Sequence, residues 1–196
     1  EVRKSIGRKH TAQQFFDAFE VARKSGFDNI NTDLIAGLPT DTPESFKNSL
    51  DSIVRLNAEC ITVHTLCMKR ASRLTTEGVT LDLQQSRDAR EMLAYTQNIL
   101  GQNEYIPYYM YRQSRMVGNL ENVGWSKKGF ESLYNVYVMD ETHTILACGS
   151  GGVTKLKRNN PDYLERIFNF KYPYEYIDRF DELIQRKSGI MQFYGQ

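Results

Sequence analysis

The sequence predicts an α/β protein built on a parallel sheet that is open or forms part of a barrel. Helical and strand-like segments alternate three times, and the connections are long enough for right-handed crossovers between parallel strands. Three such units do not close a barrel, which needs eight. The 196 residues are 40% hydrophobic and contain no 18-residue apolar run, so the composition is that of a globular protein rather than a disordered or membrane-spanning one.

Three helices are predicted from N-caps and apolar stripes. Thr11 is a candidate N-cap for a first helix, which ends at Gly26. Thr42 is the candidate cap of a second helix, with Pro43 at its first position. A third helix is predicted from Leu83 to Leu100 because its apolar residues recur at helical spacing.

Three strands are predicted between and after these helices. The first alternates polar and apolar residues from Phe27 onward and stops at Gly37 and Pro39. The second runs from Cys60 to Cys67, and the third is the tyrosine-rich segment 104–112.

The pattern changes after Gly118. Two segments rich in β-forming residues, 133–140 and 144–148, predict a β-hairpin, which a glycine cluster and two helices ending near Lys187 then follow. We therefore predict two domains, residues 1–118 and residues 119–196.

Charge and cysteine content narrow the class of protein. A net charge of +1 gives no general attraction to nucleic acid or anionic lipid, so we expect neither as a partner. Three cysteines are too few for a disulfide framework, which predicts a reducing compartment and a cytoplasmic protein. The sequence opens at Glu1 without a methionine, and we expect it to be a fragment.

Asp33 and Gly37 are candidate binding residues. Ligands gather beyond the carboxyl ends of parallel strands, where Asp33 is expected to lie. Its carboxylate can accept two hydrogen bonds from a ribose diol, and Gly37 lets the backbone approach a ligand. The alternative is that Asp33 accepts backbone N–H groups of its own loop.

Two further segments have both a binding and a structural interpretation. Arg8 can clamp a carboxylate or stack on a ring, or it is an ordinary surface arginine. The glycine cluster 149–152 can form an anion-binding nest, or it is a tight exit from a strand.

No metal site is predicted within the chain. Cys60 and His64 share one face of the predicted strand while Cys67 points to the other, and no C-x-x-C pair completes a tetrahedral site. The tyrosines between residues 105 and 111 either line a cavity for a flat ligand or form strand core and rim.

The string D-L-I-x-G-L-P at residues 33–39, which ends the first predicted strand, is typical of one group of enzymes. With other segments, it resembles the radical S-adenosylmethionine (SAM) enzymes of the oxygen-independent coproporphyrinogen III oxidase family, and in particular their coproporphyrinogen dehydrogenase (HemZ-like) branch. The segments are Ile6–Thr11, Ala22–Pro39, Thr62–Leu66, Lys69–Ser72, Asn119–Trp125 and Tyr134–Asn135. The resemblance implies the C-terminal part of a partial, open radical SAM β/α barrel, followed by a hairpin and C-terminal helices.

The resemblance also implies a reaction. Members of the family convert two propionates of coproporphyrinogen III to vinyl groups by oxidative decarboxylation, giving protoporphyrinogen IX in heme biosynthesis. A [4Fe-4S] cluster on three cysteines reduces SAM to a 5′-deoxyadenosyl radical, which abstracts a propionate hydrogen. The sequence lacks the C-x-x-x-C-x-x-C motif, so we expect the cluster ligands upstream of Glu1 and an inactive fragment. An electron donor protein or reductant is the other expected partner.

The resemblance assigns SAM-binding residues but no catalytic one. The family's SAM-contacting arginine and aspartate correspond to Arg8 and Asp33, and two further contacts correspond to Cys67 and Val153. Cations for the propionates are a separate question. The candidates are Lys69, Arg70 and Arg73, and a solvated basic turn is the alternative.

Two other functions stay open. Heme-binding chaperone-like proteins of the same superfamily bind SAM or heme without decarboxylating coproporphyrinogen. A different radical SAM oxidoreductase or a methyltransferase is the other alternative.

Overall fold

The computed structural model describes residues 2, 6–67, 83–111 and 116–195. They form two compact units, residues 1–131 and residues 132–196. The division follows Glu131 rather than Gly118, where we expected it. The reason is that residues 122–126 add a strand to the sheet of the first unit.

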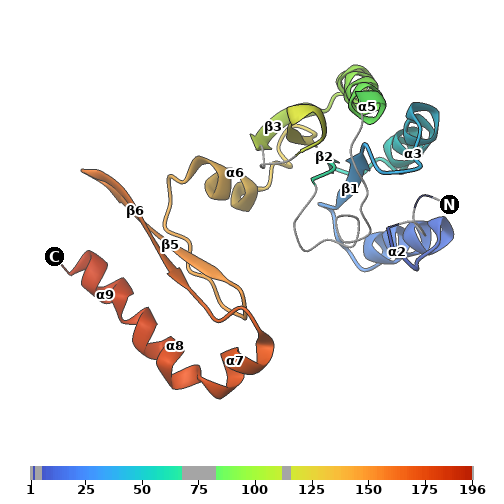
Figure 1. Cartoon of the computed structure of the whole chain (residues 1–196). Helices are drawn as coiled ribbons and strands as arrows, with labels where there is room; N and C mark the ends of the chain where they lie inside the picture. The colour runs from blue at the N-terminus through green and yellow to red at the C-terminus, as the bar shows by residue number, and fades with distance from the viewer. Residues whose placement is uncertain (1, 3–5, 68–82, 112–115, 196) are drawn as a thin grey trace. The chain divides into compact units, whose positions relative to one another are not determined.

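The first unit contains a four-stranded sheet with the order β1-β2-β4-β3. Figure 1 labels β1, β2 and β3 of this sheet. Strands β1 and β2 are parallel, and β4 is antiparallel to both β2 and β3, so β3 runs in the direction of β1 and β2. The three predicted strands are therefore confirmed, and the reversed strand between the last two was missed. The strands are β1 (Asn31–Ala36), β2 (Cys60–Thr65), β3 (Ile106–Tyr111) and β4 (Asn122–Ser126).

The three predicted helices of this unit are confirmed as α2 (Ala12–Lys24), α3 (Pro43–Leu56) and α5 (Leu83–Gln102). Thr11 Oγ1 accepts a hydrogen bond from the backbone N–H of Gln14 at 3.1 Å, and the Gln14 side chain accepts one from Thr11 N at 2.8 Å. Thr42 Oγ1 accepts from Ser45 N at 3.2 Å. These caps satisfy amides that have no partner within their helix, which is why both helices begin where the sequence predicts.

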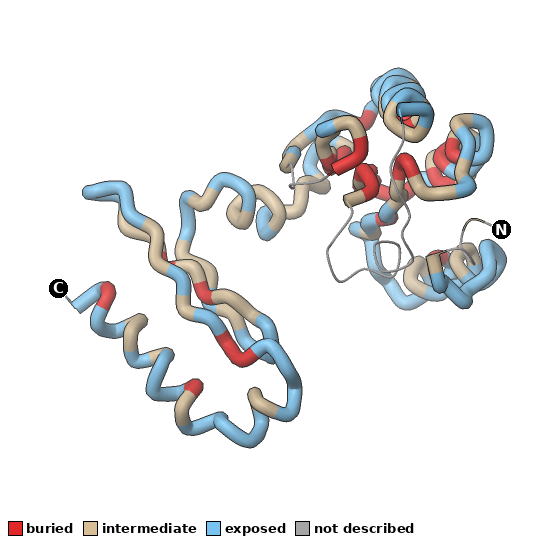
Figure 2. Tube along the Cα trace, in the orientation of Figure 1, coloured by how far each residue is buried: buried red, intermediate tan, exposed pale blue. Residues whose placement is uncertain are grey.

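One face of the sheet packs against α3 and α5. Figure 2 shows buried residues gathered along the strands and on the sides of these helices that face them. The core cluster draws on α3, α5, β1, β2 and β4 and on the residue just before β3. Its buried members are Ala36, Phe46, Leu50, Ile53, Ile61, Val63, Met92, Leu100, Tyr105 and Trp125. Because side chains alternate along a strand, the residues between these members point to the opposite face.

The second unit contains a hairpin and helices, as expected. The two helices predicted to end near Lys187 are confirmed at residues 173–178 and 180–187, but the hairpin does not lie where the sequence placed it. Residues 133–140 form a helix instead of a strand, residues 144–148 contain only an isolated β-bridge from Ile145 to Lys155, and the hairpin lies at 153–168. The elements are α6 (Leu133–Asp140), β5 (Val153–Asn159), β6 (Asp162–Phe168), α7 (Pro173–Asp178), α8 (Phe180–Lys187) and α9 (Gly189–Tyr194).

Local chemistry explains both differences. Ser132 Oγ accepts a hydrogen bond from Asn135 N at 3.4 Å, and this cap starts a helix in a segment of β-forming residues. In β5, Thr154 and Leu156 are fully buried while their neighbours are half-buried, which is the period of a strand.

Candidate functional site

A set of polar side chains covers the face of the first sheet that points away from α3 and α5. We call it the polar sheet face and define it as Asn31 and Asp33 of β1, Thr62 and His64 of β2, and Tyr109 and Tyr111 of β3. The strand register brings these residues together, since Asp33 pairs with Thr62 and Ile35 with His64. Three segments that are far apart in the sequence therefore meet on one surface.

Asp33 is the most exposed charged group of this surface. The Asn31 side chain donates a hydrogen bond to Asp33 Oδ1 at 2.8 Å. His64 Nε2 lies 3.8 Å from Asp33 Oδ2, and 59% of the aspartate side chain remains exposed. The expected alternative, capping of its own loop, is not what the carboxylate does. Asp33 is also the third residue of β1, so it lies farther from the carboxyl end of the strand than we predicted.

Tyr109 crosses β4 to reach β2. Its hydroxyl lies 3.4 Å from Thr62 Oγ1, and Thr62 Oγ1 also donates to Asn31 Oδ1 at 3.1 Å. The ring lies directly over Gly124, where a Cβ atom would be 1.8 Å from Tyr109 Cε1. Glycine is therefore required in β4 for the tyrosine of β3 to join the polar sheet face.

Hydrogen bonds and burial shift the ionisation of this surface in opposite directions. The His64 ring, more than any other neighbour, holds the pKa of Asp33 below its ordinary value, and the Asn31 hydrogen bond adds to this effect. Burial raises the pKa of Tyr109 and of Tyr111. At neutral pH the surface thus presents one carboxylate beside protonated phenols.

The structure places the other predicted site residues as follows. Arg8 is exposed and lies three residues before the Thr11 cap of α2. Cys67 is half-buried just beyond β2 and forms an isolated β-bridge with Met116. Val153 is half-buried at the start of β5 in the second unit. The cations proposed for the propionates, Lys69, Arg70 and Arg73, lie outside the described residues.

The two glycine predictions have structural answers. Gly37 has a φ of +77°, which other residues rarely adopt, and a Cβ there would lie 3.2 Å from the Cβ of Ala89 in α5. The backbone conformation and this close packing explain the glycine without a ligand. In the cluster 149–152, three backbone amides already donate within the second unit. The pairs are Gly149 N to Tyr176 Oη, Gly151 N to Phe170 O and Gly152 N to Gly149 O. The cluster therefore does not form the predicted anion nest. It is not a tight exit from a strand either, because residues 146–148 are not in a strand and the cluster instead leads into β5.

Cys60 is a structural thiol. Its Sγ donates to Phe130 O at 3.1 Å, and burial raises its pKa to about 11. A metal-binding cysteine must lose its proton, which this environment opposes. Among the residues that the structure describes, no group of three or more His, Cys, Asp or Glu side chains is arranged to hold a metal ion.

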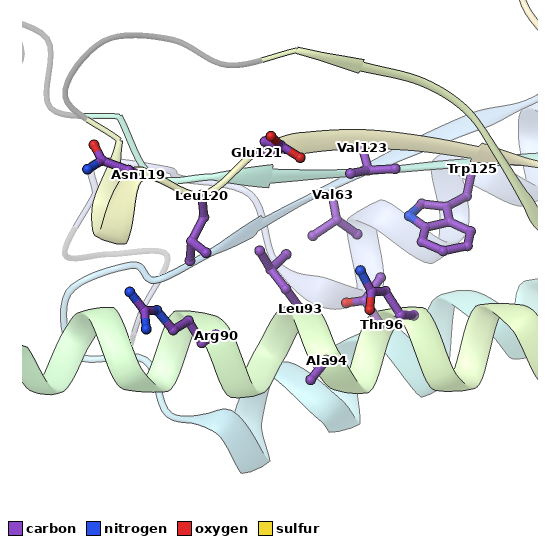
Figure 3. Close-up of a pocket in the computed structure, with 11 residues that line it drawn as sticks. Val63, Arg90, Leu93, Ala94, Thr96, Asn119, Leu120, Glu121, Val123 and Trp125 are labelled. Carbon is purple, nitrogen blue, oxygen red and sulfur yellow. The ribbon is translucent and has the colours of Figure 1, made fainter.

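A separate hollow of about 340 Å³ lies on the helix-packed side of the sheet (Figure 3). Val63 and Val123 contribute to its wall from the strands, and Arg90 and Leu93 contribute from α5. Val63 adjoins Thr62 and His64 in the strand and points to the other face, so this hollow and the polar sheet face are on opposite sides of the sheet.

The sequence proposed Asp33 as a binding residue but did not predict which side chains contact it. His64 was considered only as a metal ligand, and Asn31 and Thr62 were not considered at all. The signal was present, because polar residues at every second position of two predicted parallel strands must share a face. Tyr109 and Tyr111 were recognised as candidate lining residues, but the contact of Tyr109 with Thr62 depends on Gly124 of β4, a strand that the sequence did not reveal.

No helix within the described residues is long and apolar enough to cross a membrane.

Comparison with known proteins identifies relatives along the chain. A family model described as the radical SAM superfamily matches residues 1–53. The oxygen-independent coproporphyrinogen-III oxidase-like protein HemZ of Bacillus subtilis is 36% identical over 192 residues, which are 98% of this chain and 38% of that protein. The heme chaperone HemW of Lactococcus lactis is 31% identical over 166 residues, which are 80% of this chain and 39% of the chaperone.

The fold has a relative of known structure. Coproporphyrinogen III oxidase (HemN) from Escherichia coli, a radical SAM enzyme, matches with a TM-score of 0.63 at 18% identity, covering 92% of this chain and 40% of the other. The chain thus spans about two fifths of the length of these relatives. Over nearly its whole length, the chain belongs to the oxygen-independent coproporphyrinogen III oxidase-like family of the radical SAM superfamily.

Proposed function

We propose that this chain is the SAM-binding part of a coproporphyrinogen dehydrogenase-like enzyme, which decarboxylates two propionates of coproporphyrinogen III. The observation that supports the proposal most directly is the exposed, ionised Asp33 on a sheet of this family. We also propose a cytoplasmic location, since an odd number of cysteines is typical of proteins kept in a reducing compartment.

The polar sheet face suits the ribose of SAM. An ionised carboxylate has about four lone-pair positions, and Asn31 and His64 face two of them. The remaining positions can accept hydrogen bonds from the two hydroxyls of a ribose. Arg8 would pair with the ligand's carboxylate, and Cys67 would contact it through packing, as the family resemblance implies. For Val153, in the second unit, the proposal rests on that resemblance alone.

The chain's own cysteines do not suit the [4Fe-4S] cluster. The Cys60 thiol donates a hydrogen bond to Phe130 O, and burial raises the pKa of this thiol. The three cysteines also lack the spacing of the cluster motif. The proposal therefore requires cluster ligands, and an electron donor, from outside these 196 residues. Cluster and SAM together would supply one-electron chemistry, while the residues described here would bind and orient SAM.

A heme chaperone is the second candidate. It is favoured by the 31% identity to the Lactococcus lactis heme chaperone over 80% of this chain. A chaperone would use the same SAM-binding residues but would retain heme and leave coproporphyrinogen III unchanged.

The two candidates are distinguished by product analysis. The full-length protein would be reconstituted anaerobically with iron and sulfide and incubated with SAM, a low-potential reductant and coproporphyrinogen III. The proposal expects consumption of the substrate, release of carbon dioxide and a divinyl product. Retention of added heme without carbon dioxide release would favour the chaperone, and any other product would indicate a different radical SAM enzyme.

A further inference from the structure

The His64 ring lies between two polar groups from different strands. Its Nδ1 atom is 3.2 Å from the Tyr111 hydroxyl, and its Nε2 atom is 3.8 Å from Asp33 Oδ2. Only 29% of the histidine side chain is exposed, against 59% of the aspartate side chain. The histidine is therefore the shielded member of the group, and the carboxylate is the member that a ligand can reach.

The two contacts fix the direction of the hydrogen bonds. A neutral histidine carries one N–H, and only one arrangement makes both contacts attractive: Tyr111 donates to Nδ1, and the hydrogen on Nε2 points at Asp33. The opposite tautomer would turn an Nε2 lone pair toward the carboxylate. Asn122 also hydrogen-bonds to the Tyr111 hydroxyl and lowers its pKa, although burial raises it more. With Asn122 as the donor in that contact, the tyrosine proton remains available for His64.

The same contacts limit how Asp33 can rotate. Asn31 donates to Oδ1 at 2.8 Å, and His64 faces Oδ2. A carboxylate held at both oxygens presents its remaining lone pairs in a fixed direction, so less conformational entropy is lost when a ligand binds.

We propose that His64 is a positioning residue for a ribose-containing ligand. The Tyr111 hydroxyl donates to Nδ1 and so keeps the hydrogen on Nε2, and this Nε2–H holds the Asp33 carboxylate in the orientation that accepts the ribose diol. This inference rests on the proposed function, since it takes Asp33 as the SAM-binding aspartate. The 3.8 Å contact shortens to hydrogen-bond length when the ligand is bound, as contacts in unliganded sites commonly do. The arrangement selects ribose over deoxyribose.

The test measures binding by the full-length protein, purified anaerobically with its cluster, by isothermal titration of SAM and of its 2′-deoxyribose analogue. In His64→Phe the ring remains and both hydrogen bonds are lost. In His64→Gln an amide replaces the ring, with an NH2 group that donates and a carbonyl oxygen that accepts. In Tyr111→Phe only the directing hydroxyl is removed. Tyr95→Phe is the matched control, because it also removes a tyrosine hydroxyl that makes a side-chain hydrogen bond, to Asp51 Oδ1 at 2.7 Å, on the helix-packed side.

We expect SAM to bind about 10-fold more weakly to His64→Phe, within about 3-fold of the unchanged protein to His64→Gln, and with an intermediate loss to Tyr111→Phe. Binding of the deoxyribose analogue should change little in all three. Tyr95→Phe should bind SAM normally.

Two results would overturn the inference. One is normal SAM affinity in both His64→Phe and Tyr111→Phe. The other is an equal loss in His64→Phe and His64→Gln for both ligands, which would mean a purely structural role. If His64→Phe does not fold, the comparison of Tyr111→Phe with Tyr95→Phe decides. A separate variant, Asp33→Asn, distinguishes failure of the His64 inference from failure of the proposed function, because normal SAM binding by this variant would overturn the proposed SAM site itself.

Discussion

The two faces of the first sheet are built from adjacent residues of the same strands, yet one is packed in the core and the other carries hydrogen-bonded polar side chains. On one face, Ile61 and Val63 are fully buried against α3 and α5. On the other, Thr62 and His64 belong to a hydrogen-bonded surface that ends in the exposed carboxylate of Asp33. The apolar face therefore contributes the core packing that stabilises the fold, while the polar sheet face leaves an exposed carboxylate that we propose as a ligand contact.

The largest effect is expected on the apolar face. Leu50→Ala removes a fully buried side chain of α3 from the core cluster, so we expect the free energy of unfolding to fall by about 2–5 kcal/mol. Urea unfolding followed by circular dichroism measures the change. Val21→Ala in α2, where the side chain is 62% exposed, should stay within about 0.5 kcal/mol. Equal effects of the two substitutions would contradict the assignment of the core.

Gly124→Ala tests whether the polar sheet face also contains tightly packed positions. The added methyl group meets the Tyr109 ring, so we expect a loss of about 1–3 kcal/mol in the same unfolding measurement. Gly101→Ala, at a helical glycine with nothing within 4 Å, is the control and should be neutral or stabilising. A neutral Gly124→Ala would mean that Tyr109 does not lie across β4.

Glu59 predicts a pH dependence of stability at the start of β2. Burial opposes its ionisation, but hydrogen bonds from Arg23 at 2.6 Å and Ile30 N at 3.0 Å outweigh this and hold its pKa below the ordinary value. A lowered folded-state pKa stabilises the protein above the unfolded-state pKa, and the stabilisation is lost as pH falls through the folded-state value. Glu59→Gln should therefore cost about 1–3 kcal/mol at pH 7 and progressively less below about pH 4.

The control for Glu59→Gln is Glu20→Gln, which disrupts an exposed pair with Lys24 and should change stability by less than about 1 kcal/mol at any pH. A cost of Glu59→Gln that stays constant down to pH 3 would contradict the role of the carboxylate charge.

The sequence predicted the parts of the fold that depend on local signals. Caps at Thr11 and Thr42 located two helices, because the residues that satisfy a helix end lie within one turn of it. Strand β4 was missed because it is short, contains Gly124, and owes its conformation to partners about 60 residues earlier in β2. In the second unit, α6 was mistaken for a strand because residues such as Val136 and Tyr137 favour strands, whereas the Ser132 cap favours a helix.

For the candidate site too, the sequence indicated single residues but not their neighbours on other strands. Asp33 follows from its position in a strand and from the family resemblance. The residues that hold it, Asn31 and His64, require the register of β1 against β2, and Tyr109 requires a glycine in a strand that was not predicted. Such cross-strand neighbours depend on which residues pair, and single-strand patterns do not contain that information.

The most direct test of the division between the two faces is a paired measurement on Asp33→Asn in the full-length protein. Asparagine keeps the size of the side chain and removes the charge, and 59% of the Asp33 side chain is exposed. We expect SAM affinity to fall by about 10-fold or more, while the free energy of unfolding stays within about 0.5 kcal/mol. Unchanged SAM affinity, or a loss of stability as large as that of Leu50→Ala, would contradict the account.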